Sequence, residues 1–399
     1  MIVRTKYLNM IADGLRDVPV VVLVGTRGVG KTTLMGMFET KGKRLTLNGQ
    51  ETETAAMFKN ISIIEQYLKS YLNKNLKGCL LLDEFQYIIN LYEIVDVLIE
   101  KYKDLKIICS GSSSVEAMSL RKLLPCKTKI IEVLPLSFEE FLMVKDKKLY
   151  KILQDKNRGL DLMQLFSNMF NEYMTYGGMP RIAFLNGETE KQAELENLLK
   201  FMKKSSEHHS FIALLKYLAM QTGNMVNINA ISAEIGVSYR KCEEYMNRLE
   251  QGYIIKMTEP YVSDKRKSIT KMKKVFFCDT GLRNMIVKNF NSMDFRLDNE
   301  AIFKNYIMLE LWRNKQADGT IRFFKTSDGT EVDFVLDNIT EKIAVNCKYK
   351  TMSKPTNLVA FTRFCDDENI QKRYIVNKNL NMIHNDVKFV QGYNLNHNL

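Results

Sequence analysis

Residues 17–32 have the sequence DVPVVVLVGTRGVGKT, and this stretch decides the fold. Its first half is a β-branched run typical of a buried strand. Its second half has the spacing GxxxxGK(S/T) of a P-loop, and the LMGMFE that follows predicts a helix. In this order of strand, loop and helix, the backbone amides and the helix N-terminus surround phosphate groups. A glycine turn without a ligand is the alternative, but the flanking pattern favours a nucleoside triphosphate site.

The motif assigns a role to the polar residues of the loop. Lys31 is expected to reach the β- and γ-phosphates and to take part in catalysis, and Thr32 is expected to hold a magnesium ion. The residues expected to contact the nucleotide are Gly25, Thr26, Arg27, Gly28, Val29, Gly30, Lys31, Thr32 and Thr33. ATP is the expected nucleotide, although no base-reading motif such as NKxD near the core separates ATP from GTP.

A second apolar strand, residues 79–82, delivers two acids at its C-terminal end. In a doubly wound parallel sheet this end faces the phosphate site. Asp83 is expected to position magnesium through water, and Glu84 is expected to polarise the attacking water as the catalytic base. A solvated loop acid is the alternative for Glu84, but two acids after four apolar residues favour the catalytic role.

A third strand, residues 105–109, ends in SGSSS. Ser110 and Ser112 are expected to hydrogen-bond the γ-phosphate or the attacking water, although such serine turns are also common without function. Phosphoryl transfer also needs a cation, often an arginine from a neighbouring subunit, so a homo-oligomer is a candidate assembly. Arg121, Lys122 and Arg181 are weak candidates for this cation, and surface charges are the favoured interpretation of all three.

The composition is that of a soluble multidomain protein. A length of 399 residues suggests two to four domains, and no apolar run approaches the roughly 20 residues of a membrane span. No membrane partner and a cytoplasmic location are therefore expected. Seven cysteines lack any CxxC pair, so no zinc site is expected. The net charge of +12 favours an anionic partner, but solvated lysines give the same value.

Four segments together resemble a family of prokaryotic AAA-like ATPases: GTRGVGKTTL, LLLDEFQY, ICSGSSS and LPLSFEEF, the last at residues 134–141. Members continue with Gly-Gly-x-Pro, matched at residues 177–180, then a winged helix and a C-terminal domain of unknown function similar to PD-(D/E)xK nucleases. Members usually carry a Gly-Arg pair before the PLSF segment, whereas this chain has LPCKTK at residues 124–129. Lys127 and Lys129 are candidate substitutes for that arginine.

The resemblance implies an α/β fold class and a domain order. A P-loop NTPase (AAA-like) core with a doubly wound parallel sheet is expected at residues 1–145. A helical lid at 146–205, a winged helix-turn-helix at 206–288 and a restriction-endonuclease-like α/β domain at 289–399 are expected to follow.

The winged-helix segment carries a basic hairpin. Residues 231–235, a turn at Gly236 and a helix capped by Ser238 give the helix-turn-helix pattern, and YIIKMTEPYV and KKVFFCD resemble wing strands. The residues expected to contact DNA phosphates are Lys265, Arg266, Lys267, Lys271, Lys273 and Lys274. A solvated loop, or a wing used for protein contact, is the alternative.

The last segment follows the order of a PD-(D/E)xK site but lacks one acid. Glu300 or Glu310, Asp333 and Lys348 occupy the expected order, and Asn346 stands where a carboxylate is expected two positions before the lysine. Because magnesium held by few carboxylates binds poorly, this domain is expected to be nuclease-derived and inactive, serving for binding or dimerisation.

The leading hypothesis is a magnesium-dependent ATPase whose hydrolysis moves a basic winged-helix and nuclease-like half that contacts DNA. The alternative is an ATP-dependent regulatory or scaffold switch with slow turnover and a protein partner. A third hypothesis, an ATP-gated nuclease, is disfavoured by Asn346.

Overall fold

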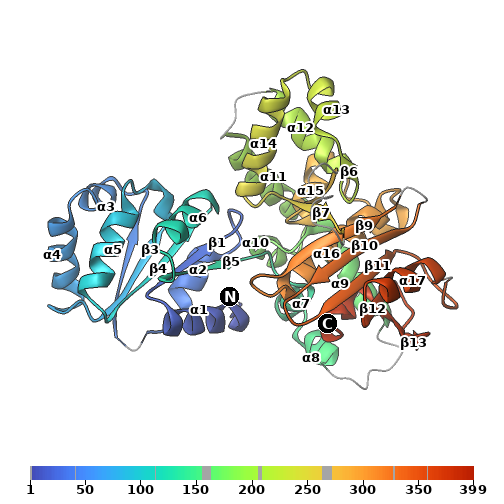
Figure 1. The fold of residues 1–399 in the computed structure, drawn as a ribbon, viewed down its shortest axis with the longest axis horizontal. Coiled ribbons are helices and arrows are strands. Elements are labelled where there is room, and N and C mark those ends of the chain that lie inside the picture. Colours follow the sequence, from blue (N-terminus) through green and yellow to red (C-terminus); the bar gives the residue numbers. More distant parts are fainter. Residues whose placement is uncertain are drawn as a thin grey trace. The chain divides into compact units, whose positions relative to one another are not determined.

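The computed structural model describes residues 2–40, 42–112, 114–154, 163–204, 209–262, 272–326, 329–356 and 358–399. The chain divides into two compact units. Unit 1 consists of Met1–Leu134 with Gln251–Ile254, and unit 2 consists of Pro135–Glu250 with Ile255–Leu399. Each unit is built around its own sheet (Figure 1). Among the described residues, no helix combines the length and the apolar character that crossing a membrane requires.

Unit 1 is built on a five-stranded parallel sheet in the order β2-β3-β4-β1-β5. The strands are β1 (Val20–Val24), β2 (Lys43–Asn48), β3 (Gly78–Asp83), β4 (Leu105–Gly111) and β5 (Thr128–Glu132). All five residues of β1 are buried, because helices cover both faces of a parallel sheet. The expected α/β P-loop fold is confirmed, and β1 lies between β4 and β5 with its C-terminal end beside theirs.

The helices of unit 1 alternate with its strands. They are α1 (Thr5–Asp17), α2 (Lys31–Met37), α3 (Thr52–Met57), α4 (Ile61–Tyr71), the short 3-10 helix η1 (Phe85–Tyr87), α5 (Leu91–Lys101) and α6 (Ser114–Leu123). Helix α1 precedes the P-loop strand and packs its apolar face, including Ile11 and Leu15, against Val21 and Leu23. This packing fixes the strand that leads into the glycine loop.

Unit 2 contains helices both before and between its strands. These are α7 (Phe138–Lys145), α8 (Lys147–Gln154), α9 (Met163–Tyr176), α10 (Pro180–Ala183), α11 (Glu188–Lys204), α12 (His209–Met220), α13 (Ile228–Glu234), α14 (Tyr239–Gln251), α15 (Thr280–Val287), α16 (Asn299–Asn314) and α17 (Val359–Asp367), with 3-10 helices η4 (Met293–Phe295) and η5 (Gly392–His397). The N-cap role of Ser238 is confirmed, since its hydroxyl accepts a hydrogen bond from the Lys241 amide at 3.2 Å. Helices α13 and α14 thus form the expected helix-turn-helix around Gly236.

Unit 2 contains one nine-stranded mixed sheet in the order β13-β14-β12-β11-β10-β9-β7-β8-β6. The strands are β6 (Met225–Val226), β7 (Ile255–Pro260), β8 (Lys273–Phe277), β9 (Thr320–Lys325), β10 (Glu331–Asp337), β11 (Lys342–Lys348), β12 (Lys372–Asn377), β13 (Met382–His384) and β14 (Val387–Gln391). Strand β7 pairs antiparallel with β8 and parallel with β9, with Glu259 opposite Arg322. The strands expected in the wing and those expected in the C-terminal domain are therefore continuous in one sheet, across the predicted boundary at residue 288.

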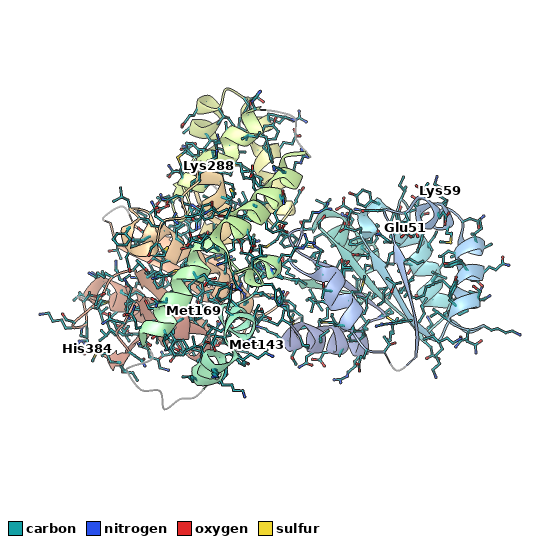
Figure 2. All side chains as sticks on the ribbon, turned by 180° about the vertical axis from the view of Figure 1, so that it is seen from behind. Glu51, Lys59, Met143, Met169, Lys288 and His384 are labelled. Atoms are coloured by element: carbon teal, nitrogen blue, oxygen red, sulfur yellow. The ribbon has the colours of Figure 1, made fainter. Side chains whose placement is uncertain are left out.

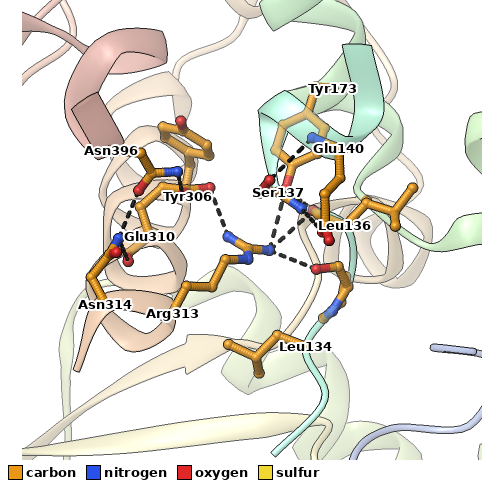
Figure 3. Close-up of polar contacts among 12 residues, drawn as sticks. Leu134, Leu136, Ser137, Glu140, Tyr173, Tyr306, Glu310, Arg313, Asn314 and Asn396 are labelled. Carbon is orange, nitrogen blue, oxygen red and sulfur yellow. Dashed lines mark hydrogen bonds and ion pairs between the residues drawn. The ribbon is translucent and has the colours of Figure 1, made fainter. Parts of the chain in front are cut away.

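The centre of unit 2 holds a polar network around the Leu136 peptide (Figure 3). The Leu136 amide donates to the Gly178 carbonyl at 2.7 Å, and the Leu136 carbonyl accepts from the Tyr173 hydroxyl at 2.6 Å and from Arg313 at 3.1 Å. The Gly178 amide in turn donates to the Asp279 carboxylate at 2.8 Å. The PLSF and Gly-Gly-x-Pro segments of the sequence are thus joined directly by hydrogen bonds.

Candidate functional site

The glycine loop of unit 1 turns sharply between β1 and α2. Gly25, Gly28 and Gly30 all have positive φ angles, of 152°, 83° and 96°. A Cβ atom on Gly25 would lie 2.2 Å from the carbonyl oxygen of Val133, just beyond β5. Only glycine therefore permits this close approach, and the loop is held against the end of the sheet.

Lys31 is folded back into the loop. Its ammonium donates to the carbonyls of Gly25 at 2.8 Å and Thr26 at 3.1 Å, and the residue is 6% exposed. Burial lowers the pKa of Lys31 to about 8, while the nearby carboxylates of Glu84 and Asp83 oppose that shift. Because a poorly solvated cation is stabilised by an adjacent anion, this position favours a phosphate group.

Asp83 is held by donors from three parts of the sheet edge. The Thr32 hydroxyl, at the start of α2, donates to Asp83 Oδ2 at 2.7 Å. The Ser110 hydroxyl, at the end of β4, donates to Asp83 Oδ1, which also accepts from the Glu84 amide at 3.0 Å. The carboxylate and hydroxyl oxygens of Asp83 and Thr32 are hard ligands of the kind magnesium takes, alongside water and phosphate oxygens.

Glu84 follows directly in an unusual backbone conformation. Its φ of 50° and ψ of 44° lie in the left-handed region, which is uncommon for a residue with a side chain. Its carboxylate Oε2 accepts a hydrogen bond from Gln86 Nε2 at 2.5 Å. Sequence reasoning assigned no role to Gln86, although it lies within the quoted LLLDEFQY segment and is the next polar residue after the two acids.

The loop also contains an unsatisfied polar atom. The Thr26 hydroxyl is buried and has no hydrogen-bond partner among the described residues, and the residue is 2% exposed. Such an atom is costly unless a ligand completes its bonding. The glycine loop, the charge of Lys31 and this hydroxyl fit the phosphates of a nucleotide, and Thr32 with Asp83 fits its magnesium ion.

The other residues predicted at the nucleotide differ in their exposure. Arg27, Gly28 and Thr33 are exposed, Val29 is fully buried and Ser112 is half-buried. Ser110 is fully buried against Asp83, so the two predicted sensor serines occupy different environments.

The cations predicted near the phosphates are engaged elsewhere or exposed. Lys127 pairs with Asp96 at 2.8 Å, and Lys129 lies 3.6 Å from Asp17. Arg121 and Lys122 are exposed on α6, and within unit 2 Arg181 pairs with Glu194 at 3.1 Å. For Arg121, Lys122 and Arg181 these positions agree with the surface interpretation.

The Asp333 carboxylate, which the sequence predicts to belong to a nuclease-like site, is neutralised by a lysine of unit 2. Lys304 Nζ lies 2.7 Å from Asp333 Oδ1, and Asp333 Oδ2 accepts from the Cys347 amide at 2.8 Å. Asn346 Oδ1 accepts from the Asp333 amide at 2.8 Å and is thus used in holding the strand. Across the described residues, no three His, Cys, Asp or Glu side chains group as a metal ion would require.

The two glutamates weighed for that site differ in position. Glu300 lies 3.6 Å from Lys304 and thus belongs to the Asp333 cluster. Glu310 is fully buried and pairs with Arg313 at 2.7 Å (Figure 3). Glu310 is therefore part of the network around Leu136, and Lys348 is half-buried at the end of β11.

Most of the predicted basic hairpin, namely Lys265, Arg266, Lys267 and Lys271, lies outside the described residues. Lys273 pairs with Glu259 at 2.9 Å across β7 and β8. Lys274 is 3% exposed, its ammonium lies 2.6 Å from Glu331, and it sits over the Phe323 ring. The prediction of an exposed phosphate contact is wrong for Lys274, because side chains alternate along β8 and Lys274 points into the sheet packing.

Three family models match separate parts of the chain. Residues 17–142 match the AAA domain, residues 167–293 match a domain of unknown function (DUF8612), and residues 299–393 match another domain of unknown function (DUF4143). The sheet and glycine loop of unit 1 define a P-loop nucleotide-binding fold. The match to the AAA domain covers the residues that carry the motifs resembling those of AAA-like ATPases.

Two curated relatives extend this similarity. An uncharacterized protein of Haemophilus influenzae is 22% identical over 373 residues, which are 88% of this chain and 87% of the relative. The uncharacterized protein MJ1544 of Methanocaldococcus jannaschii is 26% identical over 222 residues, 51% of this chain and 46% of that protein, so the match spans about half of each. Among solved structures, the Walker-type ATPase PABY2304 of Pyrococcus abyssi has a TM-score of 0.49 and 14% identity, covering 72% of this chain and 96% of that one.

Proposed function

We propose that unit 1 binds and hydrolyses ATP with magnesium, and that hydrolysis moves the winged-helix and nuclease-like half, which contacts DNA. The proposal of ATP hydrolysis rests on the hydrogen bonds that hold the Asp83 carboxylate. Hydroxyls from Thr32 and Ser110 fix both of its oxygens, and Glu84 is the next residue. This arrangement supports Thr32 and Asp83 as the magnesium ligands and Glu84 as the catalytic base.

Each residue then has a distinct part in the reaction. Lys31 offsets the negative charge of the β- and γ-phosphates, and the amides of the glycine loop hold them in place. Glu84 accepts a proton from the attacking water and orients it toward phosphorus. Magnesium, held through Thr32 and Asp83, would neutralise the phosphate charge.

The proposal of DNA contact rests on the positive charge of the chain. The chain carries a net charge of +12, and the segment between β7 and β8 is rich in lysine and arginine. A basic wing of this kind suits sequence-independent phosphate contacts that weaken with salt.

A regulatory switch with a protein partner is the second candidate, and helix α14 favours it. Its exposed start carries Tyr239 and Arg240, while Lys241 is paired with Glu244 at 2.9 Å. A face of mixed charge with an exposed aromatic ring suits a protein surface better than the DNA major groove.

ATP hydrolysis by matched variants, with and without duplex DNA, tests both candidates. Lys31→Ala and Glu84→Gln are compared with Lys59→Ala and Glu53→Gln, whose native residues are exposed on unit 1; Lys59 is labelled in Figure 2. The proposal expects the first pair to abolish turnover, the second pair to retain it, and DNA to raise it. Turnover indifferent to DNA would favour the regulatory switch, and turnover retained by Glu84→Gln would remove the assigned base.

A further inference from the structure

Within the described part of the chain, the Gln86 side chain hydrogen-bonds directly to the Glu84 carboxylate. It lies in η1, two residues after Glu84, and its Nε2 donates to Glu84 Oε2 at 2.5 Å. The left-handed conformation of Glu84 begins this tight turn, and the Tyr87 amide closes it by donating to the Glu84 carbonyl at 3.2 Å. The turn thus returns the Gln86 amide to the acid that precedes it.

The Gln86 amide is held by packing against the end of β4. A Cβ atom on Gly111 would lie 2.5 Å from Gln86 Oε1 and 2.7 Å from the Phe85 ring. A side chain at position 111 would displace the amide or the Phe85 ring, and Gly111 follows Ser110, which binds Asp83. The orientation of the amide is therefore set by the same strand end that holds the proposed metal ligand.

The carbonyl oxygen of the Gln86 amide is the next feature of this contact. Gln86 Oε1 is buried and has no hydrogen-bond partner among the described residues. A buried, unsatisfied carbonyl oxygen is unfavourable for stability, and such groups are concentrated where function requires them. Hence Gln86 is not placed here to satisfy the fold.

We propose that Gln86 is a positioning residue for Glu84 in the ATPase reaction, an inference that rests on the proposed function. By occupying Glu84 Oε2, the Gln86 amide fixes the carboxylate rotamer and leaves Oε1 to receive the proton of the attacking water. The water oxygen then bonds to the γ-phosphorus, the bond between the γ-phosphorus and the bridging oxygen breaks, and its electron pair leaves on ADP.

Two variants separate the hydrogen bond from the shape of the side chain. Gln86→Leu removes both polar atoms, and Gln86→Glu keeps the size but replaces the donor with an oxygen that repels Glu84. Gly111→Ala displaces the amide without altering Gln86. All three should lower kcat by about 10²-fold, the typical effect of misplacing a catalytic group by about 1 Å, and leave the Kd for ATP unchanged. Gln66→Leu, at an exposed glutamine of α4, is the matched control.

The test measures kcat, KM and the Kd for ATP on the same preparations, with a thermal melt of each variant. Any residual kcat of Glu84→Gln should fall no further when Gln86→Leu is added, because the positioned group is already absent. Wild-type kcat in Gln86→Glu, a loss confined to Kd, or losses that multiply in the double variant would each overturn the inference. A wild-type protein that binds ATP without hydrolysing it would overturn the proposed function instead.

Discussion

Arg313 donates hydrogen bonds from Nη2 to the carbonyl oxygens of Pro135 and Leu136, at 2.9 and 3.1 Å (Figure 3). Its other terminal nitrogen pairs with Glu310 at 2.7 Å, and Glu310 is fully buried. The segment that follows strand β5 is therefore fixed inside unit 2 by a cation whose own charge is balanced by a buried carboxylate.

Removing this cation should cost much of the stability of unit 2. Arg313→Met leaves Glu310 buried without its charge partner, and breaking such a pair costs about 3–5 kcal/mol. Urea unfolding should show this loss, while Arg363→Met, at an exposed arginine of α17, should show almost none. The double variant Glu310→Gln/Arg313→Met should be more stable than Arg313→Met alone, since it buries no unpaired charge. Equal losses in Arg313→Met and Arg363→Met would contradict the assignment.

Asp279 should make stability fall as pH rises. Burial raises the pKa of Asp279 from 3.8 to about 6, against the opposing hydrogen bonds of the Leu282 and Gly178 amides. Because the folded state holds this proton more tightly than the unfolded state, stability from protonation is complete below the unfolded pKa and is lost as pH rises through the folded pKa. The loss is on the order of 3 kcal/mol.

The measurement is the free energy of unfolding of wild type and Asp279→Asn at a series of pH values. The wild type should lose stability relative to Asp279→Asn as pH rises from about 4 to about 6. A difference that stays constant over this range would show that Asp279 keeps an ordinary pKa.

The two sensor serines should differ in their effect on nucleotide binding. Ser110→Ala removes a donor from the buried Asp83 carboxylate, and a hydrogen bond to a charged group contributes about 1.5–3 kcal/mol. The Kd for ATP with magnesium should therefore rise on the order of 10-fold or more. Ser112→Ala, at a half-buried position two residues on, should change it less. Calorimetric titration decides between them, and equal effects would remove the special role of Ser110.

The cluster around Asp333 should not cleave DNA. Lys304 neutralises Asp333, and Asn346 contributes no negative charge, so a divalent cation has too few ligands there. Supercoiled plasmid should remain intact with the wild type in magnesium or manganese. Nicking by the wild type that Asp333→Ala abolishes would show an active site in this domain.

The sequence predicted the motifs that lie in short segments, but not the contacts between distant segments. The P-loop and the two acids lie in short segments whose strand and glycine patterns specify their own backbone. The pairing of β7 with β9 joins residues more than 60 positions apart, and no local pattern specifies it. The burial of Lys274 depends on that sheet, which explains why its position was predicted wrongly.

Three further residues could not be assigned from the sequence for the same reason. Glu300 and Glu310 share helix α16, and only the partners Lys304 and Arg313 distinguish their roles. Gln86 is adjacent to the acids in sequence, but its contact with Glu84 depends on a left-handed turn and on Gly111 in the next strand.

In the proposed reaction, unit 1 hydrolyses ATP with Glu84 as the base. The most direct test measures phosphate release and ATP binding together, for wild type and Glu84→Gln, in the presence of magnesium. We expect both proteins to bind ATP with similar Kd, and only the wild type to release phosphate. Phosphate release by Glu84→Gln at the wild-type rate, or a wild type that binds no ATP, would contradict the account.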